Sequence, residues 1–413
     1  MLKRLGLNLI VLFFFLPLAA QTELLTIQDA VNTAYERNTE LQQLRAQRKQ
    51  KENEWRTATG ISSPEISYFK EGIPEGTGQA FDERRITVSQ EVDFPLTISY
   101  RLKGISEELK ALDFHIQSIE REIKAKTKSF YIEVLYALAL KDSRQNQLKL
   151  TEDLHNAVYT KFETGMANGI DLANAELRLD EAKNDLDHSE WILHQARYGL
   201  FFSIGLPVND QKYSIQFSDT LMASDIEISQ IQSLAVQENQ PEFLASEHEL
   251  NAAEFFLKET KSNILPDIRL NLYKQDFGSG YSFTGFEIGF KIPLWYPLDQ
   301  KGNLMMAIAR EEEINWKQEQ IRLSMKREIE YAWHNYSVSR SIIKRYNESM
   351  KNNAALLQNL SLKAYQLGEI DLLNLLNAQQ IFLDSEQRYL SALRDYYLQL
   401  VSLEKYLEKD LVY

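Results

Sequence analysis

Four short segments of the chain alternate apolar and polar residues, as half-exposed β-strands do. The clearest are residues 85–94 and 283–292. Each places four apolar side chains on one face of an extended chain, with only Gln90 out of pattern: Ile86, Val88, Val92 and Phe94 in the first, and Phe286, Ile288, Phe290 and Ile292 in the second. Each has a partner of the same kind shortly before it, at 66–70 and 268–274. The pattern predicts two β-hairpins, within residues 64–95 and 266–293.

Most of the remaining chain has helical periodicity. Residues 99–162 contain no proline and a single glycine, and their apolar positions are spaced 4,3,4,3,4, as in a coiled-coil seam: Ile105, Leu109, Leu112, Ile116, Ile119 and Ile123. A helix of roughly 60 residues is about 90 Å long. Further helices are predicted over 26–54, 171–203, 228–261 and 301–365, and at the C-terminal end. The fold class is therefore mostly α, with long antiparallel coiled-coil helices and four β-strands.

The sequence contains an internal repeat of one structural unit. Ala-Tyr-Glu-Arg-Asn at 34–38 is echoed by Ala-Val-Gln-Glu-Asn at 235–239, and Pro-Glu-Ile at 64–66 by Pro-Asp-Ile at 266–268. Each unit contains a helix, a β-hairpin, a long helix and a return helix. We expect the first structural repeat at residues 21–225 and the second at 226–413.

The N-terminus has the layout of a secretory signal peptide, predicted at residues 1–20. Lys3 and Arg4 precede an apolar run that ends in Ala19 and Ala20. A membrane anchor is the alternative, but the run is short for a spanning helix, and no later segment holds about 20 apolar residues. The chain has no cysteine, which excludes disulfides and thiolate metal sites, and its net charge of −13 disfavours nucleic acid as a partner.

The four strands have the length and alternation of strands that cross an outer membrane at a tilt. In lipid no strand edge stays unpaired, so such a sheet closes on itself. Four strands are too few, because spanning barrels begin at about eight. The pattern therefore predicts a barrel shared between several copies. The alternative is a small soluble sheet on a helical body.

Two glycine breaks between helices carry a doubled motif. Tyr159-Thr-Lys-Phe-Glu-Thr-Gly165 leads to Asp171-Leu172 and Ala175-Glu176, and Tyr365-Gln-Leu-Gly368 leads to Asp371-Leu372 and Ala378-Gln379. In both, the alanine stands ten residues after the glycine. With the doubled helix–hairpin–helix order and the signal peptide, this pattern resembles the TolC family of outer-membrane efflux ducts over essentially the whole mature chain.

The resemblance implies a homotrimer whose chains close a shared twelve-stranded barrel in the lipid of the cell outer membrane, above a periplasmic helical tunnel. It implies a passive exit duct in a tripartite efflux system, with a periplasmic adaptor (membrane fusion protein) and an inner-membrane pump of the RND type. The substrates would be heavy-metal cations or drugs. Gln-Glu-Val-Asp-Phe-Pro at 90–95 and Asn-Ala-Gln-Gln at 377–380 are most similar to members that serve heavy-metal pumps, with multidrug or protein export as the alternatives.

The resemblance also implies two groups of functional residues. The adaptor-docking tips are Gly165, Met166, Leu367 and Gly368, for which an ordinary interhelical turn with an apolar plug is the alternative. The periplasmic gate comprises Asp171 and the tyrosine it bonds, Tyr365. The family's gate arginine falls at Ile370, and its two acidic constriction residues fall at Asn374 and Asn377. A closed gate with fewer charged links would open more easily.

Nothing in the sequence indicates catalysis. Six histidines include no pair at i,i+4 spacing, and no phosphate-binding loop or nucleophile elbow occurs. We expect no enzyme, no catalytic or metal site and no cofactor. The rival function from another class is a soluble periplasmic coiled-coil scaffold or adaptor protein without a barrel.

Overall fold

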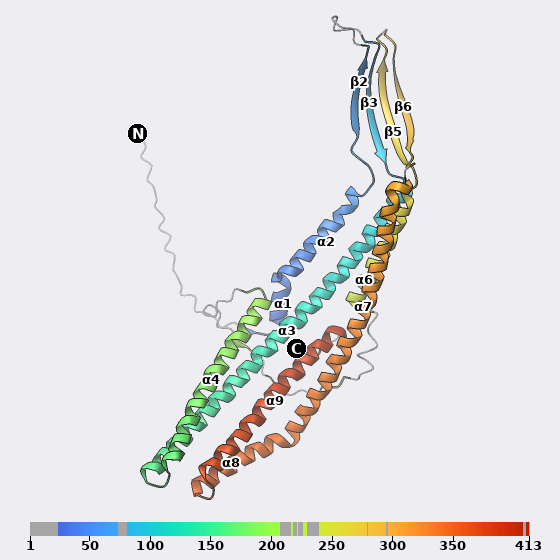
Figure 1. Cartoon of the computed structure of the whole chain (residues 1–413). Helices are drawn as coiled ribbons and strands as arrows, with labels where there is room; N and C mark the ends of the chain where they lie inside the picture. Colours follow the sequence, from blue (N-terminus) through green and yellow to red (C-terminus); the bar gives the residue numbers. More distant parts are fainter. Residues whose placement is uncertain are drawn as a thin grey trace, which may run out of the picture.

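The computed structural model describes residues 24–72, 81–206, 216–217, 221, 226–228, 239–278, 280–294, 296–407 and 410–412. The predicted signal peptide, residues 1–20, lies outside the described residues. The molecule is long and thin, with helices running side by side over most of its length and a four-stranded sheet at one end (Figure 1). This arrangement confirms the predicted mostly-α class with four strands.

The helices of the described residues are α1 (Ile27–Arg37), α2 (Thr39–Thr57), α3 (Pro95–Glu163), α4 (Gly169–Ser203), α6 (Pro241–Ser262), α7 (Tyr296–Arg345), α8 (Lys351–Leu367) and α9 (Leu372–Leu407). The 69 residues of α3 give it a length of about 100 Å. It packs along α4 towards one end of the molecule and along α6 towards the other (Figure 1). Among the described helices, none is long and apolar enough to cross a membrane.

Two predicted helices are interrupted in the structure. The expected helix over 26–54 is divided into α1 and α2 at Asn38, whose ψ is 121° and whose side chain accepts the N–H of Leu41 at 3.0 Å. The expected helix over 301–365 contains a π-helical turn, η2 (Tyr346–Met350), between α7 and α8. There Tyr346 stacks on Tyr389 of α9 with ring centroids 4.0 Å apart. A tertiary contact thus favours the extra residue in this turn.

The sheet consists of β2 (Glu65–Glu71), β3 (Glu83–Val92), β5 (Asp267–Asp276) and β6 (Ser282–Lys291), antiparallel throughout and in the order β2-β3-β5-β6. The pairing of β3 with β5 joins the two hairpins into one sheet. A separate parallel pair links β1 (Leu24–Leu25) to β4 (Gln216–Phe217). Within the described residues, the four-stranded sheet ends at the outer edges of β2 and β6.

The register separates the sheet into two faces. Even-numbered residues pair with even-numbered residues across all three strand pairs, as in Ile66 with Val88 and Val88 with Leu272. The apolar face is formed by Ile66, Tyr68, Ile86, Val88, Val92, Ile268, Leu270, Leu272, Phe286, Ile288 and Phe290. Most of these side chains are exposed. The polar face carries Ser67, Thr87, Ser89, Glu91, Arg269, Asn271 and Glu287. The apolar surface is therefore turned away from any core of this single chain.

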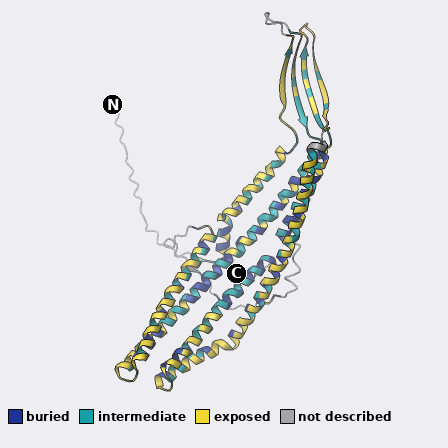
Figure 2. Ribbon diagram, viewed as in Figure 1, coloured by how far each residue is buried: buried dark blue, intermediate teal, exposed yellow. Residues whose placement is uncertain are grey.

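Buried residues gather in the middle of the helical part, where α3 runs beside α1, α4 and α9 (Figure 2). Three buried tyrosines lie in this core, and all three bond to segments outside the helices. Tyr131 donates its hydroxyl hydrogen to the carbonyl of Leu25 at 2.8 Å, and Tyr336 donates to the carbonyl of Ile226. Tyr396 stacks against Tyr336, and its hydroxyl accepts the N–H of Ile226 at 3.2 Å. These bonds fasten the connecting segments to the helices.

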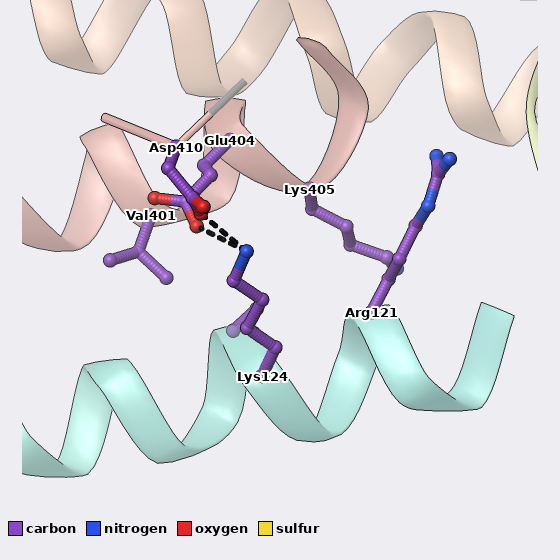
Figure 3. Close-up of a pocket in the computed structure, with 7 residues that line it drawn as sticks. Arg121, Lys124, Val401, Glu404, Lys405 and Asp410 are labelled. Atoms are coloured by element: carbon purple, nitrogen blue, oxygen red, sulfur yellow. Dashed lines mark hydrogen bonds and ion pairs between the residues drawn. The ribbon is translucent and has the colours of Figure 1, made fainter. Parts of the chain in front are cut away.

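An ion-pair cluster holds the C-terminal residues against the middle of α3. Lys128 is 2% exposed and donates to Glu404 Oε1 at 2.5 Å and to the carbonyl of Val412 at 2.6 Å. Glu404 Oε2 accepts the N–H groups of Leu411 and Val412 at 3.1 and 3.2 Å. Lys124 bonds both Glu404 and Asp410 at the edge of this cluster (Figure 3). Its hydrogen bond is the largest cause that lowers the pKa of Asp410.

Candidate functional site at the two helical tips

The first tip is the turn between α3 and α4, at the end of the molecule opposite the sheet (Figure 1). Gly165 has a φ of +76°, and a Cβ added there would meet no atom within 4 Å. The left-handed backbone, not lack of space, therefore favours glycine. After it, the N–H of Met166 donates to the carbonyl of Lys161 at 2.7 Å, which closes the end of α3.

Asn168 begins the return helix of the first tip. Its Oδ1 accepts the N–H groups of Ile170 and Asp171 at 2.8 and 2.9 Å. In return, the carboxylate of Asp171 accepts the N–H of Asn168 at 3.3 Å. This reciprocal arrangement is a capping box, which satisfies N–H groups that the helix cannot pair internally. Asp171 thus has a structural role in the tip itself.

The second tip, between α8 and α9, repeats this plan with different side chains. Gly368 has a φ of +80°, and the N–H of Glu369 donates to the carbonyl of Ala364 at 2.8 Å. Asp371 precedes α9, and its Oδ1 accepts the N–H of Asn374 at 2.8 Å. Here the aspartate itself occupies the position just before the helix.

The helix starts show which residues of the two tips are equivalent. Ala175 and Ala378 are both buried and both lie seven residues after the residue that caps the helix. Counting from them, Asn168 corresponds to Asp371, and Asp171 corresponds to Asn374. The two Asp-Leu pairs noted in the sequence therefore occupy different positions in their tips.

Each tip exposes large apolar side chains to solvent. Met166 and Leu367, which the sequence singles out, are both 75% exposed. The structure adds Ile170 and Leu373, at 74% and 73%, which sequence reasoning missed. Both are the second residue of a return helix, where charged residues are favoured. An apolar residue at this equivalent position in both tips is the signal that could have revealed them.

The two tips pack against each other through a small apolar cluster. It contains Leu154, Val158 and Ala175 from α3 and α4, and Tyr365, Leu372, Leu375 and Leu376 from α8 and α9. Lys161 adds a polar contact, since its Nζ donates to the carbonyl of Tyr365 at 3.1 Å and lies 3.9 Å from the centre of that ring. The tips of one chain thus form a single packed unit.

The predicted gate residues lie around this cluster. Tyr365 is buried, and burial raises its pKa, with the nearby carboxylate of Asp171 adding to the effect. In the described chain no hydrogen bond joins these two side chains, because Asp171 caps α4. Ile370 is half-buried against the cluster, whereas Asn374 and Asn377 lie exposed about one turn apart on α9. The structure therefore brings Asp171 and Tyr365 into electrostatic range and leaves both asparagines available to other chains.

Comparisons with known proteins match part of the sequence and nearly the whole fold. Residues 234–408 match the sequence model of the family described as outer membrane efflux protein. The fold of the outer membrane protein VceC from Vibrio cholerae superposes with a TM-score of 0.79 at 15% identity, covering 92% of this chain and 95% of that one. A membrane protein from Pseudomonas aeruginosa gives 0.78 at 17%, covering 92% and 93%. The chain therefore contains an outer membrane efflux protein domain, and its fold over nearly its whole length is that of solved outer-membrane proteins.

A further solved structure has the same fold. The MtrE outer membrane channel of Neisseria gonorrhoeae, solved in an open state, matches with a TM-score of 0.68 at 18% identity, over 92% of this chain and 88% of that one. No curated protein sequence matches the chain significantly. The efflux-protein domain and this fold are those of outer-membrane efflux channels, which are not enzymes and which hold their sheet in the membrane and their helices in the periplasm.

Proposed function

We propose that three copies of this chain form the exit duct of a tripartite efflux system. The observation that carries the proposal is the sheet, which exposes an apolar face and has unpaired outer edges at β2 and β6 within the described residues. In lipid every backbone N–H and C=O group needs a partner, so both edges must pair with other copies. Three chains supply twelve strands, an even number within the range of membrane barrels.

The helices support the same assembly. We propose repeats at residues 21–225 and 226–413, whose helices line up around a periplasmic tunnel. Large apolar side chains stay exposed on α4 and α7 of the single chain, among them Trp191, Phe202, Trp316 and Tyr331. Neighbouring copies would cover them, since exposed apolar patches commonly mark interfaces.

The tips are proposed to dock a periplasmic adaptor, which connects the duct to an inner-membrane pump of the RND type. Gly165 and Gly368 allow the sharp reversals, and Met166 and Leu367 present apolar contacts at the far end of the molecule. Ile170 and Leu373 extend each contact surface. An adaptor that buries these side chains would gain the free energy of removing them from water.

Asp171, Tyr365, Ile370, Asn374 and Asn377 are proposed to form the periplasmic gate. Ile370 and the two asparagines are uncharged, so they would add no charge to a constriction at this gate. A ring of neutral amides attracts cations less than a ring of carboxylates does. We therefore expect weak ion selectivity at this constriction.

The substrate class is proposed as heavy-metal cations or drugs. The test is the sensitivity of a strain that lacks the gene, with the gene restored as control. Metal sensitivity alone would favour cation efflux, and drug sensitivity alone would favour multidrug efflux. Equal tolerance to both, with and without the gene, would contradict both substrate classes.

The shared barrel is tested with two lysine substitutions at neighbouring residues of β5. Leu272 lies on the apolar face and Asn271 on the polar face. A lysine facing the lipid at mid-membrane costs about 2–4 kcal/mol, whereas one facing the lumen costs little. We expect Leu272→Lys to reduce the outer-membrane trimer, seen by fractionation and native mass in detergent, and Asn271→Lys to retain it. A wild-type protein that is a soluble monomer would refute the duct and favour the periplasmic scaffold.

A further inference from the structure

Three cationic side chains lie where the apolar face stops, at the end of the sheet farthest from the helices (Figure 1). Lys70 of β2 pairs in register with Arg84 of β3, and Lys274 of β5 pairs with Ile86, one row nearer the helices. The ring of Phe81 lies 5.6 Å from Lys70 Nζ and 5.0 Å from the Arg84 guanidinium. Cations thus border the apolar face on three neighbouring strands.

Carboxylates at this end of the sheet lie on both faces, and one further cation, Arg85, lies on the polar face beside Glu83. On the polar face, Glu71 and Glu83 are register partners, at the same level as Lys70 and Arg84 on the apolar face. One carboxylate, Asp276, does lie on the apolar face, and it accepts from Arg84 Nε and from a terminal nitrogen at 3.0 and 2.7 Å.

Two of the three cations remain available. Arg84 is engaged by Asp276, but neither Lys70 nor Lys274 has a carboxylate within ion-pair distance among the described residues. Asp82 in the adjoining turn packs against Gly72. The described part of each chain therefore presents two ammonium groups without ion-pair partners on its apolar face.

The height of the apolar face places these lysines at the lipid headgroups. From the level of Phe94 to the row of Lys70 and Arg84 is ten residues, or about 33 Å of strand, which rises about 25 Å at a tilt of about 40°. The apolar band of a membrane barrel is about 25 Å tall, so this row lies at the polar boundary, and Lys274 lies one row nearer the helices. A lysine there extends its alkyl chain along apolar surface and places its ammonium among the headgroups.

We propose that Lys70 and Lys274 bind the phosphate groups of a lipid in the outer leaflet. The two lysines lie two strands and one row apart, about 12 Å, so they can bind separate phosphates of one headgroup. Phosphate suits them because it offers several acceptor oxygens and negative charge to an ammonium donor. The inference rests on the proposed trimeric barrel, whose outward face must be the apolar one.

The test measures binding of fluorescently labelled, bisphosphorylated lipid A to the full-length trimer in detergent. The variant is Lys70→Gln/Lys274→Gln. Its matched control is Lys149→Gln/Lys363→Gln, which removes the same charge from two exposed lysines on α3 and α8. Each headgroup-facing lysine contributes about fivefold in affinity, so the double variant should bind on the order of thirtyfold more weakly, and the control should bind like the wild type.

Further arms separate the lipid site from free-phosphate binding and from a general effect of charge. Dephosphorylated lipid A should bind as weakly to the wild type as lipid A does to the double variant, and inorganic phosphate at the same concentration should not compete. Equal affinity of the double variant and the wild type, or an equal loss in the control, would overturn the site. Native mass is recorded for each sample: loss of the trimer in the wild type refutes the duct, whereas an intact trimer with unchanged lipid binding refutes only the lipid site.

Discussion

Replacing Lys128 by methionine tests how the C-terminal residues are held to the helical core. Lys128 lies in the middle of α3, and its ammonium contacts Glu404, Asp410 and the carbonyl of Val412. Methionine has a similar length and no charge. The substitution therefore leaves the packing nearly filled but removes the cation beside Glu404, which is itself only 8% exposed.

The expected loss is about 3 kcal/mol of local stability. Removing one partner of a buried ion pair costs about 3–5 kcal/mol, because the other charge stays buried without compensation. Two features of this site favour the lower end. Glu404 still accepts the N–H groups of Leu411 and Val412, and Lys124 Nζ remains 3.4 Å from Glu404 Oε1.

A double-mutant cycle isolates the ion pair. Glu404→Leu removes the anion, and the double variant Lys128→Met/Glu404→Leu removes both charges. A well-packed apolar pair can replace a buried ion pair at little cost. We expect the double variant to be less destabilised than the sum of the single variants by about 2 kcal/mol, within the range found for residues in contact.

Hydrogen exchange of the amides of α3, α9 and residues 410–412 is the suitable assay, because a large membrane assembly does not unfold in two states. The Lys128→Met variant should open these amides roughly a hundredfold more often, while the tips exchange as in the wild type. Unchanged hydrogen exchange at 410–412 would refute the idea that a buried ion pair holds these residues to the helices. The same conclusion would follow if the loss of stability in the double variant equalled the sum of the losses in the single variants.

Two further predictions concern the backbone conformation of two glycines and the dependence of stability on pH. Gly368→Ala should destabilise the second tip by about 1–2 kcal/mol because of its positive φ, whereas Gly302→Ala in α7 should stabilise its helix by about 0.5–1 kcal/mol. Local hydrogen exchange distinguishes them, and equal effects would contradict the backbone explanation. The hydrogen bond from His115 is the largest cause that lowers the pKa of Glu249 to about 2, from 4.5. The lowered pKa of Glu249 adds about 2 kcal/mol to the free energy of unfolding after solvent screening. This stabilisation should be present above pH 4.5 and lost as the pH falls towards 2. Acid unfolding of Glu249→Gln should show a flatter profile than the wild type, and parallel profiles would contradict it.

The architecture could be predicted from the sequence because its signals are local and repeated. Alternation over ten residues defines a strand with two unlike faces, and a long stretch without proline defines a long helix. The register confirms the apolar face, because Val88 aligns with apolar partners on both neighbouring strands, Ile66 and Leu272.

The interruptions of the helices could not be predicted in this way. Asn38 ends one helix and caps the next without any proline or glycine, because its side chain competes with the backbone for an N–H group. The π turn at Tyr346 accompanies a stack on Tyr389, more than forty residues away. A contact of that kind leaves no periodic trace near the turn.

The tips show where a sequence match misleads. The sequence places the two tip glycines correctly, because a left-handed backbone favours glycine. The Asp-Leu pair that both tips share suggests that the two aspartates are equivalent, and the positions at which the return helices begin contradict this. At equivalent positions the first tip has Asp171 and the second has Asn374. The proposed trimer would therefore present two kinds of tip in alternation, with similar apolar contacts from Ile170 and Leu373 but with the aspartate at a different position. An adaptor that docks on both must accept this difference, so the apolar contacts can be shared between the two sites while the polar contacts cannot.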